Sequence, residues 1–266
     1  MTKYKIVNVE IANIYNNDSF KSEIISQALI WEKLEIIKTN KNWFKVRQWD
    51  CYEGWIHNSY LIDDNIYNKN NLSNKYKWYA VQNRIIKAES IDSNVIKYLS
   101  FGSVIPIIDK QNDIFVSIFP NGEKFHINKL FLLPFNMKIS IQNIIDLAIE
   151  NLGVPYTWGG KSGFGYDCSG FIQSLFRFAN INLPRDSKEQ IKYDNLKKIK
   201  NNYMGGDLIF FSENNKVSHV GMFINKVNFI HCSGEVKINS IDNNKRNYCN
   251  SLYEKFYGVY RFENNV

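Results

Sequence analysis

Short apolar runs, interrupted by Asn, Asp, Ser and Gly, fill the first half of the chain from residue 3 to about residue 134. No part of this half keeps the 3.6-residue period of an amphipathic helix. Short runs separated by turn-forming residues are typical of small antiparallel barrels. The pattern therefore predicts β-structure throughout the first half.

The spacing of apolar positions recurs within this half at an offset of 70 residues. The matched pairs are Leu34 with Val104, Ile36 with Pro106, Val46 with Val116, Trp55 with Phe125 and Leu61 with Phe131. A recurring spacing indicates a repeated unit, so we infer two tandem barrels over residues 1–65 and 76–134. The polar segment from Asp64 to Lys75 is expected to connect them.

Apolar residues begin to recur at helical spacing after Pro134. The first helix is predicted from Ile141, Ile144, Ile145, Ala148, Ile149 and Leu152. Ser140 is placed to cap the N-terminus of this helix, and Gly153 is placed to end it.

A second helix is predicted from Cys168 to about Ala179, with Asp167 as its N-cap. Strand-like runs follow over residues 208–211, 217–224, 227–232 and 257–262. Helices followed by a set of antiparallel strands predict an α+β domain, here over residues 135–266. The expected fold class is therefore multidomain, with two small all-β barrels before an α+β domain.

Composition indicates a folded protein. Its 266 residues are long for one domain, and 44% hydrophobic with 15% aromatic residues can fill a core in each of two or three units. No apolar run can serve as the core of a signal peptide or reaches the roughly 20 residues that span a bilayer. We therefore expect a cytoplasmic protein with no membrane insertion.

The net charge of +7 is spread along the chain. Residues 136–266 hold 16 Lys and Arg against 12 Asp and Glu, which leaves +3 for the first half. This distribution is too even for a nucleic-acid-binding face. The four cysteines, at positions 51, 168, 232 and 249, have no C-x-x-C spacing for zinc, so we expect free thiols in a reducing compartment.

Cys168 is a candidate nucleophile because it opens a predicted helix. A helix N-terminus with a cationic partner lowers a cysteine pKa from about 8.5 toward roughly 3.5–7.5 and so favours the reactive thiolate. The glycine-rich stretch over residues 158–167 can bend tightly and leave backbone open to a substrate. Such a loop can also hold phosphate, but Gly-Lys-Ser/Thr does not occur here at P-loop spacing.

His219 and His231 are placed to act on this thiol. His219 shares one face of its predicted strand with Gly221, and His231 comes an even 12 residues later on the next strand. If the two strands pair in even register, both rings lie on one face with Cα atoms about 7–8 Å apart. His219 would then take the Cys168 proton and later protonate the leaving amine, while His231 holds it in the right tautomer.

Two other interpretations stay open from spacing alone. A lone cysteine at a helix start is more often a small buried residue than a nucleophile, and a lone strand histidine is more often structural. Two histidines and a thiol also suggest a metal site.

Six ordered sequence blocks resemble the NlpC-type cell-wall peptidases over about residues 140–262. They are 155–160 (PYTWGG), 166–171 (YDCSGF), 183–187 (LPRDS), 206–211 (GDLIFF), 218–221 (SHVG) and 229–231 (FIH). The resemblance implies a papain-like α+β fold, with Cys168 as nucleophile, His219 as base and His231 as third polar residue. It implies no metal and no organic cofactor.

The same resemblance pairs the Tyr156 hydroxyl with the backbone N–H of Cys168 as an oxyanion hole. Tyr156 could otherwise be an ordinary core aromatic. The substrate-binding candidates in this domain are Trp158, Asp167, Ser169 and Arg185. Asp167 and Ser169 are also residue types that any helix start prefers, and Arg185 could instead form a surface ion pair rather than meet a substrate carboxylate.

The first half resembles the bacterial Src-homology-3-type barrels that precede this catalytic domain in a subgroup cleaving γ-D-glutamyl bonds. Residues 43–46 (WFKV) and 52–56 (YEGWI) carry the resemblance, and residues 123–125 (EKF) carry a weaker one in the second barrel. In that subgroup the first barrel closes one end of the cleft, so substrates present a free N-terminal L-Ala amine. Tyr52, Asp50 and Glu53 are candidates to receive this ammonium, or are ordinary barrel surface.

The sequence therefore predicts a cysteine endopeptidase that hydrolyses the γ-D-glutamyl–diamino acid bond of peptidoglycan stem peptides through an acyl-enzyme on Cys168. The missing signal peptide favours recycling of imported wall fragments. Two rivals remain: an amidase or transpeptidase on the same fold, and a catalytically silent protein that binds cell wall. Neither the diamino acid nor the oligomeric state is predicted.

Overall fold

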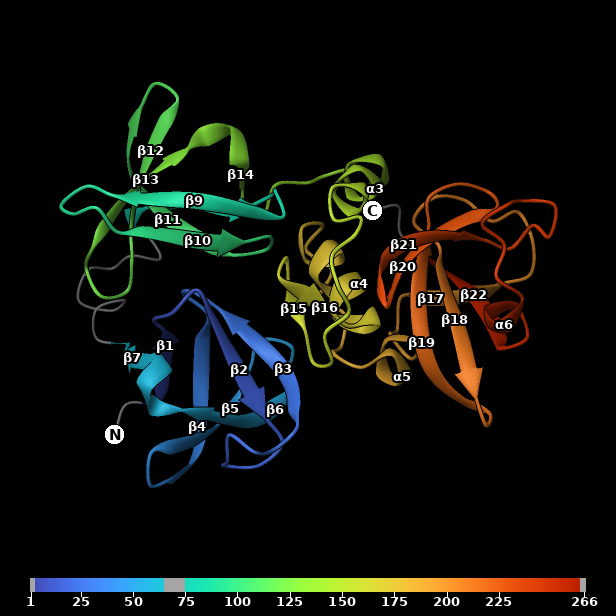
Figure 1. Cartoon of the computed structure of the whole chain (residues 1–266), viewed down its shortest axis with the longest axis horizontal. Coiled ribbons are helices and arrows are strands. Elements are labelled where there is room, and N and C mark those ends of the chain that lie inside the picture. The colour runs from blue at the N-terminus through green and yellow to red at the C-terminus, as the bar shows by residue number, and fades with distance from the viewer. Residues whose placement is uncertain (1–2, 65–74, 264–266) are drawn as a thin grey trace. The chain divides into compact units, whose positions relative to one another are not determined.

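The computed structural model describes residues 3–64 and 75–263 (Figure 1). The chain divides into two compact units, of which unit 1 holds residues 1–137 with 162–164 and unit 2 holds residues 138–161 with 165–266. The connecting segment predicted from Asp64 to Lys75 falls mostly on residues 65–74, which lie outside the described residues. The predicted domain limits, 1–65, 76–134 and 135–266, stay predictions.

A seven-stranded antiparallel sheet forms the first part of unit 1. Its strands are β1 (Tyr4–Val7), β2 (Ile11–Tyr15), β3 (Ile24–Leu29), β4 (Lys33–Asn40), β5 (Trp43–Arg47), β6 (Glu53–His57) and β7 (Leu61–Asp63). They pair in the order β3-β2-β6-β5-β4-β1-β7. Buried and partly buried residues alternate along β5 and β6, as expected for strands with one face on a core. Phe44, Val46 and Ile56 are among the residues that fill this core.

A second seven-stranded antiparallel sheet repeats this strand order, as β10-β9-β13-β12-β11-β8-β14. Its strands are β8 (Lys77–Val81), β9 (Ile85–Ser90), β10 (Ile96–Ser100), β11 (Val104–Gln111), β12 (Ile114–Ile118), β13 (Lys124–Asn128) and β14 (Leu132–Pro134). In both sheets a single 3₁₀ turn, at Asn58–Tyr60 and Lys129–Phe131, leads into the last strand.

The equivalent elements of the two sheets are 71 residues apart over their second halves. Strands β5 and β12 begin at residues 43 and 114, and β6 and β13 begin at 53 and 124. The predicted offset of 70 is therefore one residue short, and Phe125 is equivalent to Gly54 rather than to Trp55. Gly54 has no side chain because a Cβ atom there would lie 2.4 Å from Ile14. The buried position at Gly54 thus lacked the apolar residue on which the matching depended.

Trp31 joins the cores of the two sheets within unit 1. It follows β3 and is 4% exposed. Its indole Nε1 donates a hydrogen bond to the carbonyl oxygen of Ile118 at 3.1 Å, and its ring packs edge to face on Trp78 with centroids 5.7 Å apart. Ile6 and Ile30 lie in the same buried cluster as the core of the second sheet. The two sheets therefore share one continuous core.

Unit 2 combines helices with a six-stranded antiparallel sheet. The helices are α3 (Ile141–Ile149), α4 (Cys168–Arg177), α5 (Ser187–Gln190) and α6 (Asn250–Tyr253). The sheet strands are β17 (Leu196–Ile199), β18 (Leu208–Glu213), β19 (Lys216–Phe223), β20 (Asn228–Ser233), β21 (Glu235–Ser240) and β22 (Phe256–Phe262), in the order β17-β22-β18-β19-β20-β21. The short strands β15 (Lys161–Ser162) and β16 (Gly165–Tyr166) pair just before α4.

Both predicted helices are confirmed together with their caps. The Ser140 hydroxyl accepts a hydrogen bond from the backbone N–H of Asn143, whose side chain accepts one from the Ser140 N–H. This reciprocal pair fixes the start of α3. Helix α4 is buried from Cys168 to Phe176 and packs against β19 and β20. It therefore forms a rigid support for whatever stands at its first residue.

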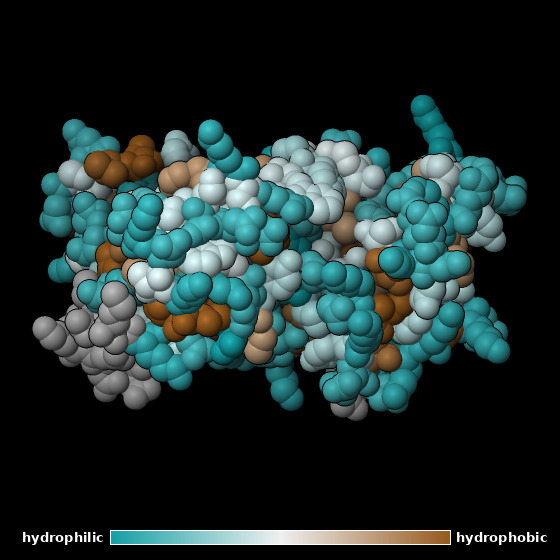
Figure 2. All heavy atoms as spheres, turned by 90° about the horizontal axis from the view of Figure 1, so that it is seen from below, coloured by the Kyte–Doolittle hydropathy of each residue, from teal (hydrophilic) through white to brown (hydrophobic). Residues whose placement is uncertain are grey.

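Hydrophilic side chains cover most of the face seen in Figure 2, and apolar residues show through in separate patches. The longest helix in the described part of the chain, α4, has ten residues, about half of what a bilayer requires. None of the helices described is long and apolar enough to cross a membrane.

We expect Trp31→Ala to lower the free energy of unfolding of unit 1 by about 3–5 kcal/mol, because it leaves a cavity in the shared core and removes the bond to Ile118. Urea titration followed by circular dichroism measures the loss. Tyr98→Ala removes an aromatic ring that is 47% exposed and should cost about 1 kcal/mol or less. Equal losses for the two variants would contradict the joining role of Trp31.

Candidate active site

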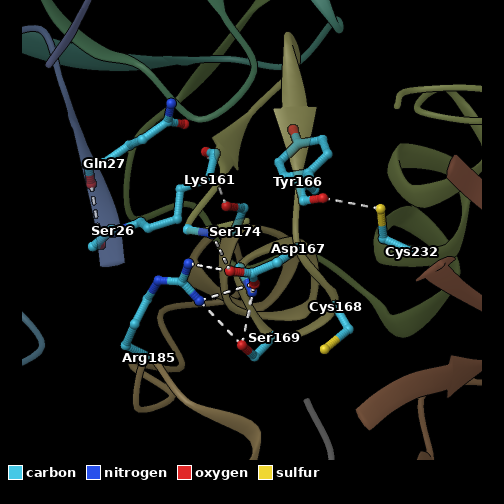
Figure 3. Close-up of polar contacts among 12 residues, drawn as sticks. Ser26, Gln27, Lys161, Tyr166, Asp167, Cys168, Ser169, Ser174, Arg185 and Cys232 are labelled. Carbon is cyan, nitrogen blue, oxygen red and sulfur yellow. Dashed lines mark hydrogen bonds and ion pairs between the residues drawn. The ribbon is translucent and has the colours of Figure 1, made fainter. Parts of the chain in front are cut away.

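Cys168 is the first residue of α4, and the cap of this helix sets its position. Asp167 has extended backbone and accepts a hydrogen bond from the N–H of Gly170 at 2.7 Å. The helix therefore begins at Cys168, which is 8% exposed. Figure 3 shows Cys168 beside Asp167 and Ser169 at this helix start.

The thiol of Cys168 lies against the strand that carries His219. Its Sγ is 4.0 Å from the carbonyl oxygen of Ser218, and the backbone N–H of Val220 also reaches the sulfur. Ser218 and Val220 are the chain neighbours of His219 in β19. The fold therefore brings the candidate nucleophile to the candidate base.

Burial raises the pKa of the Cys168 thiol to about 12, and the Asp167 carboxylate adds to the rise. The N–H groups of Val220 and Ser169 act in the opposite direction without offsetting the burial. The thiolate expected from the helix N-terminus is therefore wrong for the resting site, because desolvation outweighs the helix end. The resting thiol keeps its proton near pH 7.

His219 and His231 lie on one face of the sheet, which confirms the predicted even register. His231 on β20 stands opposite Gly221 on β19, two residues from His219. The Nε2 atom of His219 is 2.7 Å from Nδ1 of His231. The two rings form a hydrogen-bonded pair, which leaves Nδ1 as the remaining nitrogen of His219.

Both imidazoles are neutral near pH 7. Burial lowers the pKa of His219 to about 3, and His231, Lys237 and Lys255 lower it further. Burial lowers the pKa of His231 to about 4, against a smaller rise from its hydrogen bond to Asn239. A general base must be unprotonated before it acts, so the resting site holds a competent base beside a neutral thiol.

Gly221 makes room for the contact between the rings. A Cβ atom at this position would lie 3.0 Å from Cβ of His231 and 3.1 Å from the Phe229 ring. Any larger residue would push the His231 side chain away from its place in the sheet. The glycine that follows His219 by two residues therefore has a steric reason.

Tyr156 is held near this pair by its backbone. Its N–H donates to the carbonyl oxygen of Gly234 at 2.8 Å, and it forms a bridge with Tyr166, two residues before Cys168. Burial raises the pKa of Tyr156, and Cys168 and then Asp167 add to the rise. The phenol therefore keeps its proton at neutral pH and can donate a hydrogen bond to an oxyanion.

Asp167, Ser169 and Arg185 form a buried polar cluster (Figure 3). Nη1 of Arg185 donates to Oδ1 of Asp167 at 2.9 Å and to the Ser169 hydroxyl at 3.0 Å, while Nη2 donates to the other Asp167 oxygen. The N–H of Gly159 also donates to Asp167, at 3.0 Å. Arg185 is 2% exposed. The carboxylate that Arg185 meets in this structure is that of Asp167, which caps the helix of Cys168.

The predicted binding residues outside this cluster are Trp158, Tyr52, Asp50 and Glu53. Trp158 is 62% exposed, in the loop before β15. Glu53 opens β6 in unit 1, and its carboxylate pairs with Arg47 at 2.8 Å and Lys45 at 3.0 Å. The N–H of Tyr52 donates to Oδ1 of Asp50 at 3.1 Å. These last three residues belong to unit 1 and are described within it alone.

Asn239 is a polar residue beside the ring pair that the sequence reasoning missed. Its Oδ1 atom is 2.8 Å from Nε2 of His231. It lies on β21, which was not predicted. The alternation of polar and apolar residues over 235–240 (EVKINS) is the signal that could have revealed this strand.

The chemical groups gathered here are a thiol, two imidazoles, a phenol and backbone N–H groups, which suit acyl transfer. Over residues 3–64 and 75–263, no three His, Cys, Asp or Glu side chains come together as a metal ion would need.

Two family models match the chain. Residues 153–256 match the NlpC/P60 family, and residues 11–62 match the bacterial SH3 domain. The first match covers the site from Tyr156 to Asn239. The second covers Asp50, Tyr52 and Glu53.

Several known proteins are similar in sequence. The gamma-D-glutamyl-L-lysine dipeptidyl-peptidase of Bacillus subtilis (strain 168) is 36% identical over 137 residues, which cover 50% of this chain and 46% of that protein. The chain thus spans about half the length of this relative. Dipeptidyl-peptidase 6 of Lysinibacillus sphaericus is 26% identical over 262 residues, which cover 89% of this chain and 91% of that protein.

Solved structures share the fold over nearly the whole chain. An NlpC/P60 family protein from Bacillus cereus ATCC 10987 has a TM-score of 0.85 at 20% identity, over 98% of this chain and 100% of that chain. An NlpC/P60 endopeptidase from Photobacterium damselae subsp. piscicida has a TM-score of 0.70 at 18% identity, over 99% of this chain and 71% of that chain. Together with the family matches, these likenesses identify an NlpC/P60 domain in this chain, preceded by a bacterial SH3 domain.

Proposed function

We propose that the chain is a cysteine endopeptidase that hydrolyses the bond between γ-linked D-Glu and a diamino acid in peptidoglycan peptides. The observation that carries the proposal is the hydrogen-bonded pair of His219 and His231 beside the Cys168 thiol at the start of α4. Relatives named gamma-D-glutamyl-L-lysine dipeptidyl-peptidase support this choice of bond.

In the proposed acylation step, Sγ of Cys168 bonds to the carbonyl carbon while Nδ1 of His219 takes the thiol proton. The carbonyl oxygen becomes an oxyanion, to which the Tyr156 hydroxyl and the backbone N–H of Cys168 donate hydrogen bonds. His219 then gives its proton to the diamino acid nitrogen as the C–N bond breaks. The γ-D-glutamyl group is left as a thioester on Cys168.

Water completes the proposed cycle. His219 takes a proton from water as the oxygen attacks the thioester carbon, and Sγ of Cys168 leaves and regains that proton. The net reaction consumes one water and releases a carboxylic acid and an amine. Because the resting thiol is neutral, the thiolate and imidazolium exist only while the reaction proceeds.

We propose that Arg185 acts through Asp167, by holding the start of α4, and does not contact the substrate. The buried bonds of its guanidinium to Asp167 and Ser169 support this assignment. Trp158 is exposed and offers an aromatic face that a substrate can cover. It remains our candidate for binding the peptide.

We propose that unit 1 selects for a free N-terminal L-Ala amine. Glu53 is already balanced by Arg47 and Lys45, which makes Tyr52 and Asp50 the stronger candidates to receive the ammonium. The repeated strand order supports a second SH3-like barrel over residues 76–134 beside the first over 1–65. The cytoplasmic location predicted from the sequence stays a prediction, which cell fractionation tests.

Incubation with L-Ala-γ-D-Glu-meso-diaminopimelate, and in parallel with the L-Lys peptide, is expected to release L-Ala-γ-D-Glu from at least one of them. Mass spectrometry identifies the products. Cys168→Ala should abolish release because no thioester can form, while Cys249→Ala, which changes a thiol outside the proposed site, should retain it. A new peptide bond would favour a transpeptidase, a released sugar would favour an amidase, and no product at all would favour wall binding.

Acetylation of the L-Ala amine is expected to block hydrolysis of the same peptide, because it removes the ammonium that we assign to unit 1. The measurement compares product release from the free and acetylated peptides at equal concentration. Asp50→Asn should raise KM for the free peptide more than it lowers kcat. Equal cleavage of both peptides would refute the amine selection and leave the hydrolase assignment standing.

The acid limb of kcat/KM should lie well below pH 6.5. This limb reports the pKa of the base in the free enzyme, and burial lowers the pKa of His219 to about 3. A base with a lowered pKa stays unprotonated as pH falls, so we expect activity to persist at pH 5. Circular dichroism at each pH checks that the chain stays folded. A midpoint near 6.5 would contradict the neutral, desolvated base.

A further inference from the structure

Asn239 ends a line of three polar side chains that crosses three neighbouring strands. His219 lies on β19, His231 on β20 and Asn239 on β21, which are adjacent in the sheet. His231 stands opposite Lys237, and Asn239 lies two residues further along β21. Each partner in the line is therefore displaced by two residues, so all three side chains share one face.

The orientation of the Asn239 amide follows from its second partner. Nδ2 is 2.7 Å from the backbone carbonyl oxygen of Asn247. A carbonyl oxygen only accepts hydrogen bonds, so the atom that faces it is the NH₂ group, and the atom that faces His231 is the amide oxygen. The same carbonyl accepts from the N–H of Ser240 at 3.0 Å, which holds it against β21.

An amide oxygen at this place determines where both histidines carry their protons. Nε2 of His231 faces Oδ1 of Asn239 at 2.8 Å, so this nitrogen must be the donor. A neutral imidazole has one N–H, and Nδ1 of His231 is therefore an acceptor. Nε2 of His219, 2.7 Å away, must then carry the hydrogen, which leaves Nδ1 of His219 bare.

We propose that Asn239 is a positioning residue that sets the tautomers of His231 and His219, so that Nδ1 of His219 is free to take the Cys168 proton. This inference rests on the proposed function and adds a residue to the same site. Asn239 acts through the two rings and touches neither the thiol nor the substrate.

The charges that act on the rings support a neutral relay. Lys237 acts on both histidines and Lys255 on His219, and each lowers the ring pKa, as burial does. No carboxylate is among the groups found to raise either ring pKa; the hydrogen bond from Asn239 is the one such influence on His231. A second proton on His231 is therefore disfavoured at neutral pH, as the one-hydrogen argument requires.

Without the amide oxygen, His231 can move its proton to Nδ1. That proton would face Nε2 of His219 and force the His219 hydrogen onto Nδ1. The base would then present an N–H to the thiol in place of a lone pair. Loss of Asn239 should therefore slow the proton transfer and leave substrate binding intact.

The kinetic test compares Asn239→Leu, which keeps the approximate shape, with Asn239→Asp, which keeps an acceptor for Nε2–H. We expect Asn239→Leu to lower kcat about 10- to 100-fold, the range found when a partner that orients a functional histidine is removed, with little change in KM. Asn239→Asp should recover much of kcat and move the acid limb of the pH profile upward, because a carboxylate stabilises a protonated ring. Asn244→Leu, in the exposed loop after β21, should leave kcat unchanged.

A spectroscopic test needs no substrate. The chain has four histidines, so ¹⁵N-histidine labelling gives few ring signals, which His219→Gln and His231→Gln variants assign. In the wild type we expect both rings as the Nε2–H tautomer. Asn239→Leu should change this pattern at His231 and His219, and Asn239→Asp should preserve it.

The two tests together separate this proposal from the proposed function. A wild type that cleaves no peptide but shows both Nε2–H tautomers, lost in Asn239→Leu, would sink the peptidase and keep the positioning role. An Asn239→Leu variant with full kcat, or with lowered kcat and unchanged tautomers, would overturn the positioning role. A variant that loses its near-ultraviolet dichroism is replaced by Asn239→Asp, for which a switch of tautomer would equally refute the proposal.

Discussion

The hydrogen bond between His219 and His231 depends on one register in the sheet of unit 2. A shift of one residue between β19 and β20 would turn one ring to the opposite face. Gly221 helps to hold this register, because a Cβ atom there would collide with His231, and α4 packs on the same two strands. The thiol of Cys168, the base and the amide of Asn239 all take their places from this strand pairing.

The line of side chains behind Cys168 contains no carboxylate. In a Ser-His-Asp arrangement a buried anion stabilises the imidazolium that forms, whereas here His231 and Asn239 are neutral hydrogen-bonding groups. The imidazolium therefore receives support from dipoles alone, which agrees with a low pKa at His219 and a high one at Cys168. Such a site holds its proton on sulfur until the substrate carbonyl offers a better place for the charge.

Sequence reasoning identified the parts of the fold that local chemistry determines. The caps at Ser140 and Asp167 and the even spacing from His219 to His231 all follow from nearby residues, and the structure agrees. Strand β21 and the 71-residue repeat were missed, since half-exposed alternation and a glycine in a core position, Gly54, leave weak signals. The thiol pKa was wrong because burial by distant segments cannot be read from spacing along the chain.

Asp167 and Arg185 are joined inside the protein, where Arg185 is 2% exposed. Replacing either one alone leaves the other as an uncompensated buried charge, at a cost of about 3–5 kcal/mol. That cost is a large share of the roughly 5–15 kcal/mol by which domains are stable. A sequence drifting by single substitutions thus meets a barrier at both positions, and the loop before Cys168 can change its cap only by changing residues 167 and 185 together.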